Sequence, residues 1–185
     1  SYSRSVPISV ETTGTLVTGK TIATLLINNS EEYMITIYGD QSVIDEIDSV
    51  PVTINVDGRG NESVWTYDVN IRKPNGVREM SVDSVEITAT FGEEQQTTID
   101  ITNDIDEINL ADGLTVNILS GQTITVQAKG VASVLEDLGD TRVNAYIDLA
   151  GYGVGDHEVE VKINNTNPLI TYVVSSTVRI RIAEE

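Results

Sequence analysis

The amino-acid sequence predicts an all-β fold with short helices, arranged as two tandem domains. Valine, isoleucine and threonine are common, whereas the chain of 185 residues contains one Phe, one Trp and two Met. β-Branched side chains favour strands over helices because they pack well on a pleated surface. Many short stretches also alternate apolar and polar residues, which is typical of strands with one buried face. Finally, one long pattern occurs twice, which indicates a repeated architectural unit.

The repeated pattern reads "GDQSVIDEIDSVPVTINVDG" at residues 39–58 and "GVASVLEDLGDTRVNAYIDL" at residues 130–149. The opening glycines, Gly39 and Gly130, lie 91 residues apart. In each copy a serine, an apolar pair and an acidic pair follow, and an alternating stretch ends in Asp57 or Asp148. The pattern therefore predicts two domains, residues 1–91 and 92–185, each able to bury a modest core. The polar segment 92–96 is expected to link them.

In each half, strands precede the glycine that opens the repeat, Gly39 or Gly130. In the first half we expect strands at 6–12, 21–28 and 33–39, and in the second half a strand at 123–130. After the glycine, the spacing of apolar residues changes from that of a strand to that of a short helix. Asp40 is expected to cap the first helix, whose apolar face is Val43, Ile44 and Ile47. In the second copy this face is Val134, Leu135 and Leu138, and Gly139 ends the helix. Helices this short need a sheet to pack on.

The remaining elements of each half are strands. A strand resumes at Val52 and at Val143, and the glycine-rich stretches 58–60 and 151–155 are interpreted as hairpin turns. Alternation then predicts buried positions at Val64, Thr66, Val69 and Ile71, and at Val159, Val161 and Ile163. "KPNG" at 73–76 has the composition of a turn. The closing strands are expected at 84–91 and 177–184.

Charge excludes several classes of partner. The formal net charge is −18, and both halves share the acidic excess. Such a surface repels phosphate backbones and anionic lipid headgroups, so we expect no nucleic acid and no direct adsorption to a membrane. No apolar run is long enough to form a transmembrane helix within these residues. The chain has no cysteine, which excludes disulfides, thiolate metal sites and a cysteine nucleophile.

The order of elements resembles the YbbR-like domain family of bacterial envelope proteins. The resemblance lies in the strand leading into glycine, the "QSVIDEID" or "ASVLEDLG" helix, the strand ending in Asp57 or Asp148, and the closing strand. It implies two tandem YbbR-like twisted β domains with crossed hairpins. Family members typically stand outside the cytoplasmic membrane behind one N-terminal transmembrane helix. The resemblance therefore implies an extracytoplasmic chain, tethered through an anchor outside these residues.

The same resemblance implies a function and a partner. Family members include regulators of a membrane-bound diadenylate cyclase, the enzyme that makes cyclic di-AMP, and the active site belongs to the cyclase. A non-catalytic regulatory or binding module of the cell envelope is the function expected here. A structural stalk or adhesin-like spacer of tandem β domains is the alternative. A neighbouring cyclase gene would favour the regulator, and a cell-wall sorting signal would favour the stalk.

The single histidine, His157, is the first candidate for chemistry. An imidazole titrates near neutral pH and could serve as a general base or a pH sensor. However, no serine has the context of a hydrolase nucleophile, so no catalytic triad is indicated. We expect His157 to be an exposed residue at the start of a strand, between Asp156 and Glu158. No catalytic residue is predicted.

Carboxylates are the remaining candidates. The acidic stretch 100–113 offers oxygen ligands that Ca²⁺ prefers, but the spacing from Asp104 reaches Ile108 where an EF-hand needs an oxygen. We therefore interpret it as a solvated strand edge. Asp57 and Asp148 lie in different domains, so they cannot act as a catalytic pair, and we expect each to hydrogen-bond the backbone of the turn that follows it. The glycine-rich stretches lack the helix of a phosphate-binding loop. No metal or cofactor is predicted.

Overall fold

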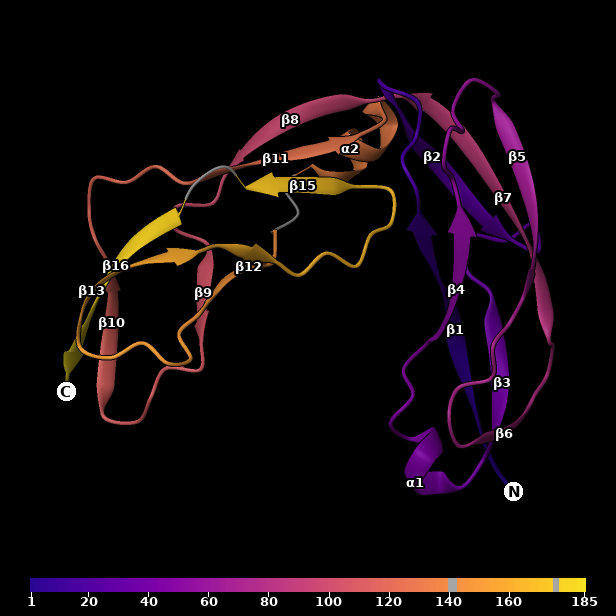
Figure 1. Ribbon diagram of the computed structural model, residues 1–185, viewed down its shortest axis with the longest axis horizontal. Coiled ribbons are helices and arrows are strands. Elements are labelled where there is room, and N and C mark those ends of the chain that lie inside the picture. The colour runs from indigo at the N-terminus through magenta and orange to yellow at the C-terminus, as the bar shows by residue number, and fades with distance from the viewer. Residues whose placement is uncertain (140–142, 175–176) are drawn as a thin grey trace. The chain divides into compact units, whose positions relative to one another are not determined.

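The computed structural model describes residues 1–139, 143–174 and 177–185. The chain divides into two compact units, Ser1–Glu94 and Gln95–Glu185 (Figure 1). Strands dominate both units, and each unit has one short helix. The predicted all-β class with short helices is confirmed. No helix in the described ranges combines the length and the apolar character that crossing a bilayer requires.

The first unit is built from two sheets. One has the strand order β4-β1-β3-β6 and the other β2-β7-β5. The elements are β1 (Tyr2–Thr13), β2 (Lys20–Ile27), β3 (Met34–Gly39), α1 (Gln41–Ile44), β4 (Val50–Asn55), β5 (Val64–Asn70), β6 (Val77–Met80) and β7 (Ser84–Glu93).

Strand β1 pairs with two partners in succession. Its first half, from Tyr2 to Pro7, runs antiparallel to β3. Its second half, from Ile8 to Thr13, runs parallel to β4. Parallel neighbours need a crossover connection. Helix α1 lies in that connection, between β3 and β4, and it packs against β1 and β3. The repeated segment is therefore the crossover of the unit.

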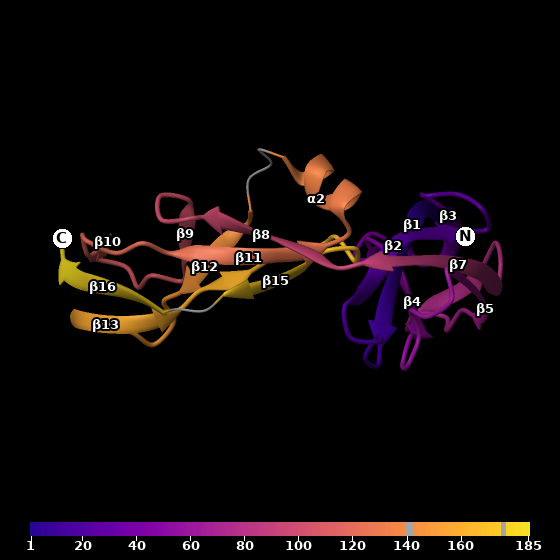
Figure 2. The same cartoon turned by 90° about the horizontal axis from the view of Figure 1, so that it is seen from above.

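The second unit repeats this plan with more interruptions. The role of β1 is divided between β8, which pairs antiparallel with β11, and β9, which pairs parallel with β12. Figure 2 shows β8, β11 and β15 side by side, as their pairing requires. The elements are β8 (Gln95–Asp100), β9 (Ile105–Ile108), β10 (Leu114–Ile118), β11 (Thr125–Gly130), α2 (Ala132–Leu138), β12 (Ala145–Asp148), β13 (Gly155–Glu160), β14 (Lys162–Ile163), β15 (Thr171–Val174) and β16 (Thr177–Glu184).

Each unit has a core of aliphatic side chains. In the first unit Ile35, Ile37 and Ile87 have no exposed surface. In the second unit Ile147 and Ile180 are equally buried. No polar or charged side chain is buried anywhere in the described residues. Burial of apolar surface is therefore the main favourable term in the stability of both units.

The glycines that open the two repeats are required by close packing. A Cβ at Gly39 would lie 3.1 Å from the carbonyl oxygen of Gly76 and 3.3 Å from Ile44. A Cβ at Gly130 would lie 3.2 Å from the carbonyl oxygen of Leu169. Both distances are shorter than ordinary van der Waals contacts. The strand before the helix thus ends where a loop carbonyl from elsewhere in the unit passes directly over the backbone.

The helix of the first unit is held by an arginine of β1. Arg4 Nη1 donates to the carbonyl oxygens of Ile47 at 2.8 Å, Asp45 at 3.3 Å and Ile44 at 3.4 Å. These carbonyls lie at and after the end of α1, and that of Ile44 also accepts from the N–H of Ile47 at 3.1 Å. In the second unit the matching position on β8 is Thr97, which faces Ala128 as Arg4 faces Ile37. A threonine cannot make this contact, so the two helices are secured differently.

The predicted cap and faces of the helices are partly wrong. The Asp40 carboxylate does not cap α1 and instead accepts a hydrogen bond from Arg78 at 2.8 Å. Ile44 is fully buried, but Ile47 lies beyond the end of α1 and is half-buried. In α2 no residue is buried, and Leu138 is half-buried. The apolar faces were identified, but their depth was overestimated because short helices at the rim of a sheet keep solvent on one side.

The predicted segment 92–96 contains the junction between the units, at Glu94 and Gln95, but it does not form a polar linker. Strand β7 continues to Glu93, where it pairs with Lys20, and β8 begins at Gln95, which pairs with Gly130. Only Glu94 separates the two strands, and its N–H donates to the carbonyl oxygen of Gly19 at 2.9 Å. A polar composition was interpreted as a loop, although these residues lie on exposed strands.

Three further predictions need correction. Val64 and Thr66 of β5 are exposed, and Val64 retains 48% of its surface. Trp65 and Tyr67 pair with the fully buried Ala89 and Ile87, so they lie on the core side of β5. Val69 and Ile71 were predicted correctly on that side, since Val69 is half-buried and Ile71 is buried. The glycine-rich stretches 58–60 and 151–155 are not hairpin turns, because β4 and β5, and likewise β12 and β13, belong to different sheets. Finally, β12 begins at Ala145, whereas Val143 was expected to start it.

The close packing at the repeat glycines predicts a stability loss on adding one methyl group. We expect Gly39→Ala and Gly130→Ala each to lower the free energy of unfolding by about 1–3 kcal/mol, because the new Cβ presses on a backbone carbonyl. Gly153→Ala is the matched control, since its Cβ would meet nothing within 4 Å. Denaturant unfolding followed by circular dichroism measures the difference. Equal stabilities for all three variants would contradict the packing argument.

The Arg4 contact predicts a local loss of order around α1. We expect Arg4→Met to speed hydrogen exchange in residues 41–47 and to cost about 1 kcal/mol, because three carbonyls lose a charged donor at a partly exposed site. The control is Arg78→Met, whose ion pair with Asp40 joins two side chains that are each 65% exposed. Exchange mass spectrometry should leave that control close to the unmodified chain. Indistinguishable exchange in the Arg4 variant would rule out the contact as a helix anchor.

The division into two compact units predicts that residues 1–94 fold alone. The unit contains all pairing partners of its own strands. Expressed alone, it should give dispersed amide signals and a β-rich circular dichroism spectrum. A collapsed, undispersed NMR spectrum would show that the first unit depends on the second.

Candidate functional site

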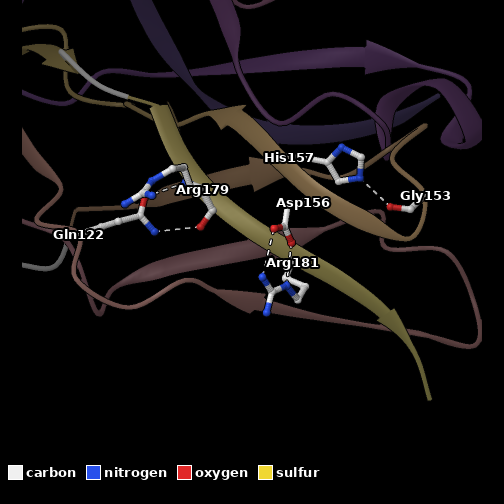
Figure 3. Close-up of polar contacts among 6 residues, drawn as sticks. All are labelled: Gln122, Gly153, Asp156, His157, Arg179 and Arg181. Atoms are coloured by element: carbon white, nitrogen blue, oxygen red, sulfur yellow. Dashed lines mark hydrogen bonds and ion pairs between the residues drawn. The ribbon is translucent and has the colours of Figure 1, made fainter.

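His157 lies in β13 of the second unit, where its ring fastens a loop. Its Nε2 donates to the carbonyl oxygen of Gly153 at 2.7 Å (Figure 3). The Tyr152 ring lies 5.0 Å away, centroid to centroid, in an edge-to-face arrangement. The expectation of a solvent-exposed histidine is therefore wrong in part, because the ring is half-buried. A histidine that holds the loop before its own strand has a structural role in this geometry.

An ion pair links β13 to the neighbouring strand β16. Asp156 and Arg181 face each other across β13 and β16, and the guanidinium binds the carboxylate with Nε–Oδ1 and Nη2–Oδ2 distances of 2.7 and 3.1 Å (Figure 3). This pair lowers the pKa of Asp156 and raises the pKa of Arg181. Both side chains are more than half exposed. The pair favours the observed register but offers no group with altered reactivity.

Gln122 extends the contacts of β16 beyond the end of β10. Its Oε1 accepts from the backbone N–H of Arg179 at 2.7 Å, and its Nε2 donates to the carbonyl oxygen of Arg179 at 2.9 Å (Figure 3). The same Nε2 donates to the carbonyl oxygen of Leu119 at 2.6 Å. One side-chain amide thus satisfies both backbone groups of Arg179. No sequence pattern indicated this residue, because an amide in a polar loop has no distinguishing signal.

The recurring aspartates lie in different units, and each carboxylate holds a loop. Asp148 Oδ1 accepts from Asn109 Nδ2 at 2.9 Å and from the N–H of Ala150 at 3.0 Å, as expected for the turn that follows it. The hydrogen bond from Asn109, together with the one from the N–H of Ala150, lowers the pKa of Asp148. Asp57 differs from expectation: its Oδ1 accepts from the N–H of Thr15 at 3.0 Å, in the loop after β1.

The acidic stretch 100–113 follows the edge of a small sheet. Strand β9 lies at the edge of the order β14-β12-β9. Asp100 Oδ1 accepts from the hydroxyl of Thr102 at 2.6 Å and from its N–H at 2.9 Å, and these bonds lower the pKa of Asp100. Within residues 1–139, 143–174 and 177–185, no group of three or more His, Asp or Glu side chains is placed to hold a metal ion.

A groove of about 610 Å³ in the first unit is the best candidate for binding. One wall is β4, with Pro51, Val52 and Thr53, and the other is the end of β5 with the loop after it. Arg72 and Lys73 line the loop side. Sequence reasoning missed this site, because the groove depends on which strands lack a neighbour.

The charges at the groove contrast with those of the whole chain. Arg72 makes no hydrogen bond or ion pair within the part of the chain that the structure describes. Lys73 Nζ donates only to a backbone oxygen, that of Arg78, at 2.9 Å. Glu11 is the single acidic residue in the lining. Two cations without carboxylate partners therefore flank an apolar floor on a protein of net charge −18.

The aromatic residues of β5 close one side of this region. Arg59 stacks on the Trp65 ring, with Cζ 3.5 Å from the ring centroid, and its guanidinium also lies 3.8 Å from Glu62. The Tyr67 hydroxyl donates to the carbonyl oxygen of Asn55, the last residue of β4, at 3.0 Å. Partial burial raises the pKa of Tyr67. These contacts tie β5 to the end of β4 and leave the middle of β4 open.

Solved structures of similar chains include two bacterial proteins with YbbR-like domains. The YbbR-like domain of the lmo2119 protein from Listeria monocytogenes shares 18% identity, with a TM-score of 0.41, over 49% of this chain and 95% of that domain. A YbbR-like protein from Streptococcus pneumoniae TIGR4 shares 12% identity, with a TM-score of 0.36, over 100% of this chain and 95% of its own. At these scores the likeness carries no argument about function.

Sequence comparison is more informative. A family model described as YbbR-like protein matches residues 96–182, nearly the whole second unit. The CdaA regulatory protein CdaR of Bacillus subtilis (strain 168) is 26% identical over 167 residues, which cover 89% of this chain. The chain spans 33% of the length of that relative. These matches confirm the predicted resemblance to the YbbR-like protein family, whose model covers residues 96–182 of this chain.

Proposed function

We propose that this chain is a non-catalytic regulatory module that acts through contact with a protein partner. The observation that carries the proposal is the match to a relative named as a regulatory protein, over 89% of the chain. The geometry supports it, because the polar side chains singled out as candidates for chemistry hold loops or strands in place. A groove with an open strand edge, by contrast, suits recognition of another chain.

The partner in this proposal is a membrane-bound diadenylate cyclase, and the full-length protein changes the output of cyclic di-AMP. The family resemblance supports this partner, and the name of the relative, a regulator of CdaA, agrees with it. We place the chain outside the cytoplasmic membrane, tethered by an anchor beyond these residues. The net charge of −18 supports a protein partner, since it opposes binding to nucleic acid or anionic lipid.

Removing this region from the full-length protein should change cellular cyclic di-AMP. The experiment compares three strains: one with the intact gene, one without the gene, and one whose gene lacks only residues 1–185 but retains the rest. Extracted nucleotide is quantified by mass spectrometry, and the cyclase is sought in the material that co-purifies from detergent-solubilised membranes. We expect the altered nucleotide level of the deletion strain to recur when only these residues are absent.

A His157→Ala strain serves as the control, because that side chain contacts only its own loop and should leave the nucleotide level unchanged. If both deletion strains keep the normal level and the cyclase does not co-purify, regulation is excluded, and the chain acts as a spacer. A spacer of tandem β domains would still require folded units, so the stability predictions above are independent of this result.

A further inference from the structure

The free edge of β4 in the first unit is the starting point. In the order β4-β1-β3-β6 this strand has a neighbour on one side only. The carbonyl oxygen of Asn55 points away from β1, since it accepts the Tyr67 hydroxyl at 3.0 Å. Alternate residues of a strand direct their backbone groups to the same side. The N–H and C=O of Thr53 therefore face the groove, and Thr53 is exposed.

In the second unit the matching edge is already occupied. Strand β12 follows α2 as β4 follows α1, and Asn144 and Ala145 correspond to Thr53 and Ile54 in the repeat. Strand β14 pairs antiparallel with β12 through Ala145 and Ile163 and through Tyr146 and Lys162. The N–H of Asn164 then donates to the carbonyl oxygen of Asn144 at 2.9 Å. The fold thus accepts an antiparallel strand at this edge.

The length of one connection explains why the first unit leaves the edge open. Val69 and Ile71 correspond to Val159 and Val161, and the buried Val77 corresponds to Ile170, because their N–H groups donate to equivalent carbonyl oxygens, those of Pro74 at 3.1 Å and Asn167 at 3.3 Å. The connection from Ile71 to Val77 is three residues shorter than that from Val161 to Ile170, so the first unit lacks the residues that form β14 and the Asn164 contact. The chain turns away instead: the N–H of Ile71 donates to the carbonyl oxygen of Asp83 at 2.8 Å, and residues 71–74 form no strand. The groove of about 610 Å³ lies where β14 would otherwise pair.

We propose that this groove binds an extended, acidic segment of a partner protein, which adds as a strand antiparallel to β4. Main-chain hydrogen bonds at Thr53 hold the segment, and its carboxylates contact Arg72 and Lys73. The floor contributes the apolar side chains of Val52 and Val69. Such strand addition gains affinity from backbone bonds and specificity from alternate side chains. The inference rests on the proposed function, because it names the surface through which that partner is contacted.

The same geometry limits the strength of binding. Pro51 supplies a carbonyl but no N–H, so the pairing is short and centred on Thr53. Glu11 also lines the groove and opposes an acidic ligand. A free peptide should therefore bind weakly, whereas a partner tethered to the same membrane gains from a high effective concentration.

The test uses this chain and two synthetic peptides with blocked ends, one alternating valine with glutamate and the other valine with lysine. We follow backbone amide signals by NMR during titration at low salt. The glutamate peptide should shift the amide of Thr53, slow its hydrogen exchange and leave the amide of Asn144 unchanged. The lysine peptide should bind at least about tenfold more weakly, because it repels Arg72 and Lys73.

Two variants separate the contributions of charge and backbone. Replacing Arg72 and Lys73 together by glutamate should weaken the glutamate peptide at least about tenfold. Lys162→Glu, at the position that corresponds to Arg72, is the matched control and should have no effect. Thr53→Pro removes the N–H that pairs with the peptide, so it should weaken the glutamate peptide at least about tenfold, as followed through the amides of Val52 and Ile54. Should this proline variant fail to fold, the charge reversal on the exposed loop still decides the question.

Several outcomes would overturn the inference. Equal affinity for both peptides would overturn it. So would a Thr53 amide signal that does not change on titration, or a change in the Asn144 amide signal in its place. Changes at Thr53 that depend on protein concentration without any peptide would assign the edge to a second copy of this chain. These results leave the proposed function untouched if cyclic di-AMP still changes on deletion. Conversely, peptide binding at Thr53 with unchanged cyclic di-AMP would refute the cyclase as partner but keep the groove.

Discussion

Burial of branched aliphatic side chains is the constraint on which both units depend. Isoleucine and valine from the strands of every sheet meet in the core, and no polar side chain is buried in the described residues. Sheets of three or four strands cannot cover such a core alone, so each unit needs two or more of them. The arrangement leaves several strand edges at the surface. Polar side chains such as Gln122 and Asp57 then serve the loops and edges, where backbone groups would otherwise lack partners.

The sequence predicted the class of fold and the repeat because both leave local signals. Alternation located the closing strands, and the repeated glycine located the crossover helix. Pairing partners, by contrast, are non-local: 58–60 and 151–155 were taken as hairpin turns because consecutive strands often pair, whereas here they enter different sheets. The buried face was assigned wrongly at Val64 and Thr66 but correctly at Val69, since an edge strand such as β5 carries apolar residues on both sides.

The candidate groove shows the same limit. The three additional residues between Val161 and Ile170 are visible in the sequence, yet they have no meaning until β14 is seen to pair with β12. His157 was placed in the correct strand, but its contact with Gly153 depends on the path of a loop. Composition predicted acidic surfaces, but it could not reveal that Arg72 and Lys73, which have no carboxylate partner among the described residues, lie beside β4. Positions of charge relative to backbone edges are a property of the folded chain.

Both units have the same segment of glycine, short helix and strand, but they differ in how the helix is held and in whether the edge of the following strand is paired. Arg4 secures the helix of the first unit, and Thr97 occupies the matching place in the second. A shorter connection leaves one strand edge open, and the short strand β14 closes the other. Duplication therefore produced one unit with a firmly held helix and an accessible edge, and another that satisfies its own edge. This asymmetry is what a binding module needs if only one of its repeats engages a partner.

The Arg59 and Trp65 contact has a practical consequence for studying the two units separately. Trp65 is the single tryptophan of the chain, and it lies in the first unit with a guanidinium over its ring. Excitation of the indole therefore reports on that unit alone, whereas the tyrosines are distributed over both. Fluorescence and circular dichroism recorded on one sample would thus distinguish concerted unfolding from sequential unfolding. Trp65 fluorescence therefore measures whether the two units unfold together or one after the other.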